Sequence, residues 1–217
     1  MAPVTWTGEP QIEDIDRRVI QLFALVGEAV AGATHALLVG DREAARALVV
    51  RDAEVDARYA EIEATALSHL DAGSVSRSEI RYLIGILRML PEIERSGDLA
   101  EHIASRATRG LGTEMSARAR GLVERMGEVA CRMWRMAADA YADQSVDAAE
   151  RIDNLDDEMD DLHVTLTAEI VAGGMALPVA VELAMIGRFY ERLGDHAVNL
   201  ARRVRIWSLA SDRDGPR

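Results

Sequence analysis

A thirteen-residue stretch occurs twice in this chain of 217 residues, and the repeat constrains the fold more than any other feature. The first copy spans residues 94–106 and the second spans residues 191–203, with seven of the thirteen positions identical at a constant offset of 97. Each copy begins with the pattern Glu-Arg-x-Gly-Asp. A period of this length indicates that a whole unit of several helices was duplicated, because solenoid repeats are much shorter.

Apolar residues at spacings of three and four predict six helices along the chain. They cover approximately residues 12–38, 41–70, 76–109, 113–142, 145–171 and 176–209. Short connections between them indicate antiparallel neighbours. We therefore predict an all-α fold of two tandem, repeat-related three-helix bundles, built from six long helices. The expected divisions are a flexible N-terminal tail over residues 1–10, a first bundle over 11–110, a second bundle over 111–210 and a polar tail over 211–217.

Charge and residue content exclude several classes of function. The 37 acidic and 25 basic residues give a net charge of −12, which disfavours binding to nucleic acid phosphates. Every basic residue is Arg, so catalysis by a P-loop lysine or a Schiff-base lysine is excluded. With Cys131 as the only cysteine, an internal disulfide and a multi-cysteine zinc site are excluded as well. We expect a protein that is not an enzyme.

The sequence predicts neither a membrane span nor a secretory signal. Its most apolar stretch, residues 19–40, is interrupted by Gln21, Glu28 and His35, and so falls short of the roughly 18 uninterrupted apolar residues of a spanning helix. The N-terminus lacks a basic segment followed by an apolar core. We expect a cytoplasmic protein that meets membranes only through its partners.

Four pairs of acidic residues, each spaced i and i+4, occupy repeat-related places. The second and third predicted helices of each half carry one pair apiece: Asp52/Asp56 and Glu94/Asp98 in the first half, and Asp156/Asp160 and Glu191/Asp195 in the second. Residues at this spacing share a helix face, and antiparallel packing would place the pair on one helix opposite the pair on the next. Carboxylates grouped in this way suit hard cations, so we predict sites for divalent or ferric ions such as Fe, Mn, Mg, Zn or Ca.

The residues around these pairs leave further interpretations open. Acidic residues at this spacing also occur on plain solvated faces of acidic proteins. Gly97 and Gly194 precede the motif aspartates, and because a mid-helix glycine costs about 1 kcal/mol relative to alanine, we expect a close approach of a neighbouring backbone there. His163 and His196 are either metal ligands or solvated, hydrogen-bonded side chains.

The repeated stretches resemble the signature of the PhoU family, the regulators of phosphate uptake. The resemblance is carried by residues 94–100 and 189–201, and by residues 51–56 and 156–160 in the second helix of each half. It implies two three-helix bundles with multinuclear metal sites, of iron or a similar metal, ligated by the paired carboxylates. It also implies two partners, the ATPase subunit of a phosphate ABC transporter and a sensor histidine kinase, and a role in restraining phosphate-starvation signalling when phosphate is plentiful. We further expect a homo-oligomer, a dimer.

Two alternative functions stay open at the level of sequence. One is a carboxylate-bridged, metal-dependent helical-bundle oxidase or metal-storage protein, and the other is a structural interaction bundle that binds no metal. Di-iron enzymes of the first kind carry Glu-x-x-His motifs on two helices, whereas the comparable spacing occurs once in this chain, at Asp160 and His163. The sequence therefore favours the regulator over the oxidase.

Overall fold

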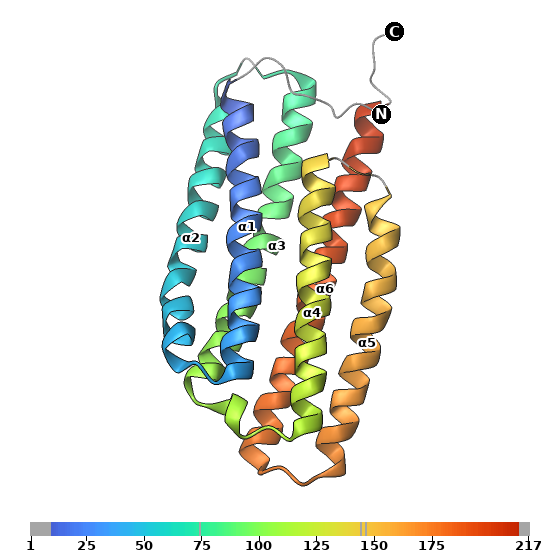
Figure 1. The fold of residues 1–217 in the computed structure, drawn as a ribbon. Helices are drawn as coiled ribbons and strands as arrows, with labels where there is room; N and C mark the ends of the chain where they lie inside the picture. Colours follow the sequence, from blue (N-terminus) through green and yellow to red (C-terminus); the bar gives the residue numbers. More distant parts are fainter. Residues whose placement is uncertain (1–9, 74, 144, 146, 213–217) are drawn as a thin grey trace.

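Six long helices make up the protein (Figure 1). The structure is a computed structural model and describes residues 10–73, 75–143, 145 and 147–212. The helices are α1 (Pro10–Val39), α2 (Arg42–Asp71), α3 (Arg77–Thr108), α4 (Ala117–Asp143), α5 (Ala148–Ala172) and α6 (Leu177–Asp212), with a short 3-10 helix, η1 (Leu111–Thr113), between the halves. The described residues contain no strand, and the predicted all-α fold of six long helices is confirmed.

The two predicted tails lie largely outside the described residues. Of the expected N-terminal tail only Pro10 is described, and it begins α1. Of the expected polar tail only residues 211–212 are described, and they end α6. Both helices therefore extend slightly beyond the boundaries that apolar periodicity predicts, as is usual for helix ends.

Local signals at the connections determine where the helices begin and end. Asp41 caps α2 because its side chain accepts hydrogen bonds from two backbone N–H groups of the first turn. Ser76 forms a capping box with Glu79 at the start of α3, in which each side chain accepts a hydrogen bond from the backbone N–H of the other residue. Gly40 has a φ of 72°, the left-handed conformation that commonly ends a helix. The chain therefore reverses between α1 and α2 over two residues.

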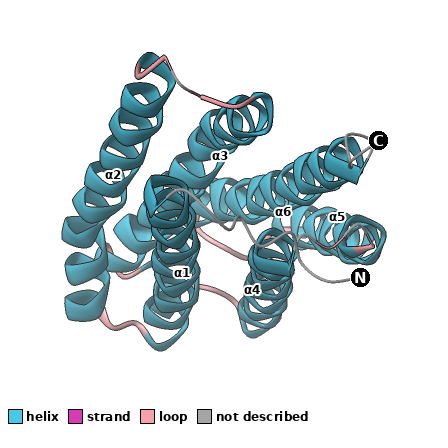
Figure 2. Cartoon of the chain, turned by 90° about the horizontal axis from the view of Figure 1, so that it is seen from above, coloured by secondary structure: helices cyan, strands magenta, loops and turns pink. Residues whose placement is uncertain are grey.

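The helices form two bundles that lie side by side (Figures 1 and 2). Helices α1, α2 and α3 pack against one another, and so do α4, α5 and α6. The bundles join where α1 packs against α4 and α3 packs against α6, while α2 and α5 lie at the outer edges (Figure 2). An outer helix needs a narrower apolar face, and α2 accordingly buries few apolar residues. Its remaining faces are available for polar chemistry.

In the contact between α1 and α4, a glycine of one helix faces a larger side chain of the other at two places. The residues at the two places are related by an offset of 100 positions. A Cβ on Gly27 would lie 3.1 Å from the ring of Trp134, and a Cβ on Gly127 would lie 2.3 Å from Thr34. Each helix thus offers a glycine to a larger side chain of the other helix, in an approximate two-fold arrangement. The Trp134 indole N–H donates a hydrogen bond of 2.9 Å to the carbonyl oxygen of Phe23. This buried bond ties the two bundles together.

The contact between α3 and α6 has the same symmetry but different chemistry on its two sides. On one side the Arg106 guanidinium lies 4.6 Å from the centre of the Phe189 ring. At the offset of 97 the related pair is Arg203 and Glu92, whose charged groups lie 3.8 Å apart. A cation–π contact in one half is therefore replaced by an ion pair in the other. The two halves have kept the positions of their contacts while the side chains changed.

Helix α1 is long and apolar enough to cross a membrane by length and composition alone, which corrects the expectation that this segment falls short. One face of this helix is buried within the protein, where Ile15, Val19 and Leu22 are fully inaccessible to solvent. Because α1 packs against α2, α3 and α4, its central position accounts for its composition.

Gly127 offers a test of the close contact between α1 and α4. Gly127→Ala should lower the free energy of unfolding by about 1–3 kcal/mol, because the new methyl group would lie 2.3 Å from the Thr34 methyl group. Gly121 is a matched control on the same helix, since nothing lies within 4 Å of its Cβ position. Gly121→Ala should stabilise the protein by up to about 1 kcal/mol. Urea unfolding followed by circular dichroism measures both changes, and equal effects would contradict this packing.

Candidate metal centre

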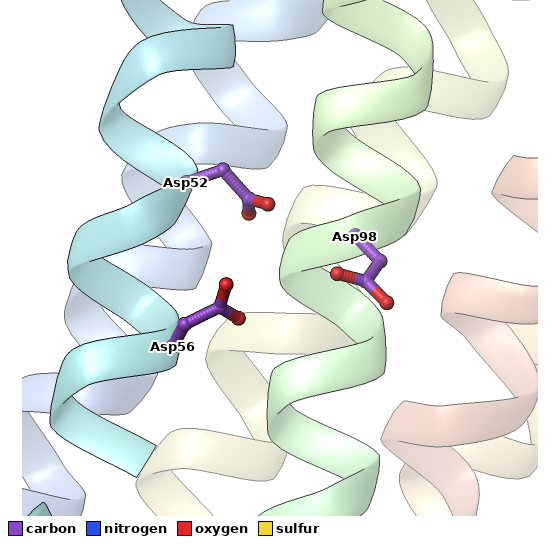
Figure 3. Close-up of side chains that lie close together, drawn as sticks. All are labelled: Asp52, Asp56 and Asp98. Carbon is purple, nitrogen blue, oxygen red and sulfur yellow. The ribbon is translucent and has the colours of Figure 1, made fainter. Parts of the chain in front are cut away.

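Three aspartate side chains converge between α2 and α3 (Figure 3). Asp52 and Asp56 project from successive turns of α2, and Asp98 projects from α3. One carboxylate oxygen from each residue lies within 4.8 Å of the other two. Asp52 and Asp98 are partly buried and Asp56 is exposed, so the cluster is open to solvent on one side. Carboxylate oxygens in this arrangement form a donor set for a hard cation whose remaining ligands are water.

The sequence brings α2 and α3 together at Gly97, the residue before Asp98. A Cβ on Gly97 would lie 3.0 Å from Val55 Cγ1 and 3.5 Å from Asp52 Oδ1. Val55 lies between the two aspartates in the sequence and is 4% exposed, so it anchors α2 on α3 at this point. The close approach expected at this glycine is present, but side chains of α2 make it rather than the backbone.

The aspartate cluster holds like charges together in partly buried surroundings. Burial raises the pKa of Asp52 to about 6, and the nearby carboxylates of Asp98 and Asp56 add to the shift. Burial and the same two neighbours also raise the pKa of Glu94. Glu94 therefore lies beside the cluster, although its carboxylate is not one of the three within 4.8 Å. A bound cation would offset this repulsion, because an opposite charge favours the ionised form of a carboxylate.

The repeat-related place in the second bundle lies between α5 and α6. Burial raises the pKa of Asp156 to about 6 there, and Asp160 and Asp195 add to the shift. A Cβ on Gly194 would lie 3.4 Å from Asp156 Oδ1. In both halves the glycine before the motif aspartate thus lies close to an aspartate of the outer helix, but the nearest atom to a Cβ on Gly194 belongs to Met133 of α4, at 3.2 Å.

The two carboxylate sets differ in how tightly they are grouped. Among the residues that the structure describes, three metal-ligating donor atoms within 4.8 Å of one another occur only in the first bundle. In the second bundle, Asp160 and Asp195 are exposed, and Glu191 accepts a hydrogen bond from Arg188. The structure therefore brings three of the four predicted carboxylates together in the first bundle and leaves the second set more open.

Glu101 is a further acidic residue at the first site that the repeat comparison does not indicate. Its charge contributes to the raised pKa of Asp52, after burial and the nearer aspartates, and both residues line the same small cleft. The repeat-related residue is Val198, which is why comparison of the halves passes over this position. Its i+3 spacing from Asp98 is the signal that identifies it, because residues at that spacing share a helix face.

The two histidines near the motifs lie in different surroundings. His196 faces the interface between the bundles, where its Nδ1 lies 3.0 Å from Ser96 Oγ and its Nε2 lies 3.7 Å from a Glu92 carboxylate oxygen. Of the two interpretations given for His196, the structure shows the hydrogen-bonded one. His163 lies close enough to Glu191 to oppose the rise in the Glu191 pKa that burial and other charges cause, which is compatible with either interpretation.

The fold and the repeated carboxylate pairs define a class of helical protein, two fused three-helix bundles that arose from one duplicated unit. Comparison with known proteins identifies the family. The family model described as the PhoU domain matches residues 19–107 and 123–204, with one match in each bundle. The chain belongs to the PhoU family, and the resemblance found in the motifs is confirmed.

Individual relatives cover both bundles. The chain is 30% identical over 199 residues to PhoU homolog 1 of Mycobacterium leprae, with 89% of each chain covered. It is 33% identical over 168 residues to the PhoU homolog of Deinococcus radiodurans, with 74% of this chain and 76% of that protein covered. The crystal structure of PhoU from Pseudomonas aeruginosa matches with a TM-score of 0.85 at 26% identity, covering 93% of this chain and 98% of that one.

The raised pKa values predict how the metal-free protein responds to pH. An aspartate in an unfolded chain titrates at about 3.9, whereas Asp52 and Asp156 titrate at about 6 in the folded protein. Between these two values the folded state binds more protons than the unfolded state, so stability falls as the pH rises through this window. In the presence of a chelator, the double substitution Asp52→Asn/Asp156→Asn should therefore raise the melting temperature at about pH 7.5 and raise it roughly half as much at about pH 5.

The comparison of parent and double variant isolates these two groups, because every other titrating residue is common to both proteins. Asparagine keeps the shape of aspartate but carries no charge at either pH. Differential scanning calorimetry at the two pH values measures the melting temperatures. A double variant whose melting temperature differs from that of the parent by the same amount at both pH values would contradict the assigned pKa shifts.

Proposed function

We propose that this protein is an accessory protein of phosphate transport that restrains the phosphate-starvation response when phosphate is plentiful. The observation that carries the proposal is the PhoU-domain match in each of the two bundles. It is supported by the relatives from Mycobacterium leprae and Mycobacterium tuberculosis, both 30% identical over 89% of this chain, which are named phosphate-specific transport system accessory proteins.

The proposed mechanism is differential binding rather than catalysis. The protein acts in the cytoplasm as an adaptor between the ATPase subunit of a phosphate ABC transporter and a sensor histidine kinase. It shifts a partner between two states by binding one of them more tightly, since a ligand moves an equilibrium only by its difference in affinity. The net charge of −12 supports electrostatic steering toward basic partner surfaces. A dimeric form belongs to the same proposal.

The proposal includes cation binding by the paired carboxylates. Asp52, Asp56 and Asp98 provide the first set of ligands, and their grouping within 4.8 Å supports this role. Glu94 completes the predicted first set, and the second set consists of Asp156, Asp160, Glu191 and Asp195. Oxygen donors of this kind suit a divalent or ferric ion. The bound ion offsets the burial and the repulsion that together raise the pKa of Asp52 and Asp156.

Removal of metal tests the cation sites. Protein purified without chelator should melt at a lower temperature after a chelator is added, because the like-charged carboxylates are then left without a cation. Addition of a divalent or ferric ion should restore the melting temperature, since a ligand that binds the folded state stabilises it. Calorimetry together with metal analysis of the starting protein makes the measurement. Identical melts with and without chelator, on protein shown to start metal-loaded, would argue against bound cations.

Single substitutions provide matched controls for this experiment. Asp98→Asn removes one charge from the aspartate cluster, so the metal content should fall while the metal-free protein melts at the same or a higher temperature. Asp195→Ala and Glu191→Ala should also lower the metal content, at a cost to the metal-free protein of less than about 1 kcal/mol. Asp157→Asn, on α5 beside Asp156 but outside the paired positions, should leave the metal content unchanged.

Deletion of the gene tests the regulatory role. In a strain without the protein, phosphate-starvation genes should be expressed in phosphate-rich medium, because the restraint on the kinase is lost. A reporter under a phosphate-starvation promoter measures this effect, and expression of the protein from a plasmid should reverse it. The regulatory proposal would be contradicted if the deletion strain, with no second copy of the gene, showed normal phosphate-responsive expression. Only the proposal of cation binding would then stand.

A further inference from the structure

A groove between α3 and α6 lies away from the aspartate cluster and has no part in the cation site. One wall is the first half of α3, with Ile84, Gly85 and Arg88, and the other is the last part of α6, with Ile206 and Trp207. The two helices pack against each other along the junction of the bundles and run in opposite directions (Figure 1). The groove therefore follows the line between two antiparallel helices.

Among the described residues, Gly85 has no close neighbour that explains its presence. A glycine within a helix costs about 1 kcal/mol relative to alanine, and at Gly97 that cost is explained by the contacts with α2. At Gly85 no atom of the described residues lies within 4 Å of the Cβ position. The repeat-related residue on α6 is Glu182, which pairs with Arg106 at 2.8 Å. The first half thus has no side chain at the position where the second half has Glu182. The backbone of another protein could approach α3 closely at this point.

The walls of the groove combine exposed apolar side chains with a fixed aromatic ring. Ile84 is 41% exposed and Ile206 is 69% exposed. The Trp207 ring packs against the buried Tyr82 ring, with centroids 5.1 Å apart. The Tyr141 ring centroid lies 6.4 Å from that of Trp207, and the Tyr141 hydroxyl donates a hydrogen bond of 2.7 Å to Asp16. The surface is therefore apolar and preformed, so binding of a ligand costs little free energy for ordering its side chains.

Positive charge surrounds these apolar side chains. Arg81, Arg88 and Arg203 line the groove, although the chain as a whole carries a net charge of −12. Arg88 is exposed and forms no ion pair with any residue that the structure describes. Arg203 already pairs with Glu92 at 3.8 Å. The exposed Arg88 is therefore the group best placed to meet an acidic side chain of a second helix.

We propose that this groove binds an acidic amphipathic helix of a partner protein. The apolar face of that helix lies against Ile84, Ile206 and Trp207, its backbone passes over Gly85, and an acidic residue of it meets the exposed Arg88. This is the helix-in-groove mode of recognition, in which apolar anchors recur at i, i+3, i+4 and i+7. A helix fits better than a small ligand, because the groove is open along its length and small-molecule sites bury most of their ligand.

Site-specific photo-crosslinking in cells that express the full chain tests the proposal. A benzoylphenylalanine residue placed at position 206 should crosslink to another protein, and mass spectrometry should place the crosslink in a segment with apolar residues at helical spacing and acidic residues beside them. Arg88→Glu should lower the yield by at least about tenfold through charge repulsion. Gly85→Leu should lower it similarly by filling the groove, and should leave the melting temperature unchanged or higher because the position is open.

Arg46→Glu is the matched control. Arg46 is exposed near the start of α2, a full helix length from the groove, and its reversal should leave the crosslink unchanged. The proposal is overturned by a crosslink to a lipid, to a second copy of this chain or to a segment without acidic residues. It is also overturned if no crosslink forms, or if the crosslink yield is unchanged in both Arg88→Glu and Gly85→Leu.

This inference stands apart from the proposed role in phosphate regulation. A crosslink to an acidic helix of a protein unrelated to phosphate transport supports the groove as a docking site and counts against the proposed partners. Loss of the crosslink in Gly85→Leu with normal metal content and an unchanged melt shows that the groove acts independently of the cation sites. The deletion experiment addresses the regulatory role without reference to the groove.

Discussion

Close packing of the outer helix α2 against the long inner helix α3, over Gly97, is the contact on which the aspartate cluster depends. Gly97 admits Val55 and the Asp52 carboxylate, and Gly194 admits the Asp156 carboxylate. Packing thus holds like charges at distances they would not adopt on an isolated helix, where such pairs repel one another. Burial, together with this repulsion, raises the pKa of Asp52 and of Asp156 to about 6. A cation bound by these carboxylates would remove their mutual repulsion, because an opposite charge favours their ionised form. The glycine in the sequence motif is thus what allows the proposed cation site to form.

Duplication explains the architecture, and divergence of the two copies explains its surfaces. The contacts between the bundles preserve an approximate two-fold arrangement, as Gly27 with Trp134 and Gly127 with Thr34 illustrate. The side chains at related positions now differ in their chemistry. Glu182 forms an ion pair with Arg106, whereas its counterpart Gly85 has no side chain. A duplicated fold can therefore keep its core while each half acquires its own external face. The tighter aspartate cluster belongs to the half that contains α3, whereas the arginine-lined groove lies between the halves, with α3 as one wall and α6 as the other.

The fold follows from local features of the sequence, whereas the detail of the sites does not. Six helices are predicted by apolar spacing, and the paired carboxylates share a helix face by simple geometry. The convergence of Asp52, Asp56 and Asp98 depends on the register of α2 against α3, which is determined by packing at Gly97. His196 meets Ser96 from a position one hundred residues further along the chain, and no local pattern predicts that contact. The apolarity of α1 likewise has its explanation in the central place of that helix.

Anomalous X-ray scattering from crystals grown with Mn²⁺ tests the central claim most directly, because it locates the cation without reference to activity or stability. The account predicts an anomalous peak between α2 and α3, at about 2.0–2.6 Å from carboxylate oxygens of Asp52, Asp56 and Asp98, with Glu94 or water completing the ligands. Crystals that contain Mn²⁺ but show no anomalous peak between these helices, with the three carboxylates turned apart or paired with arginines, would contradict it.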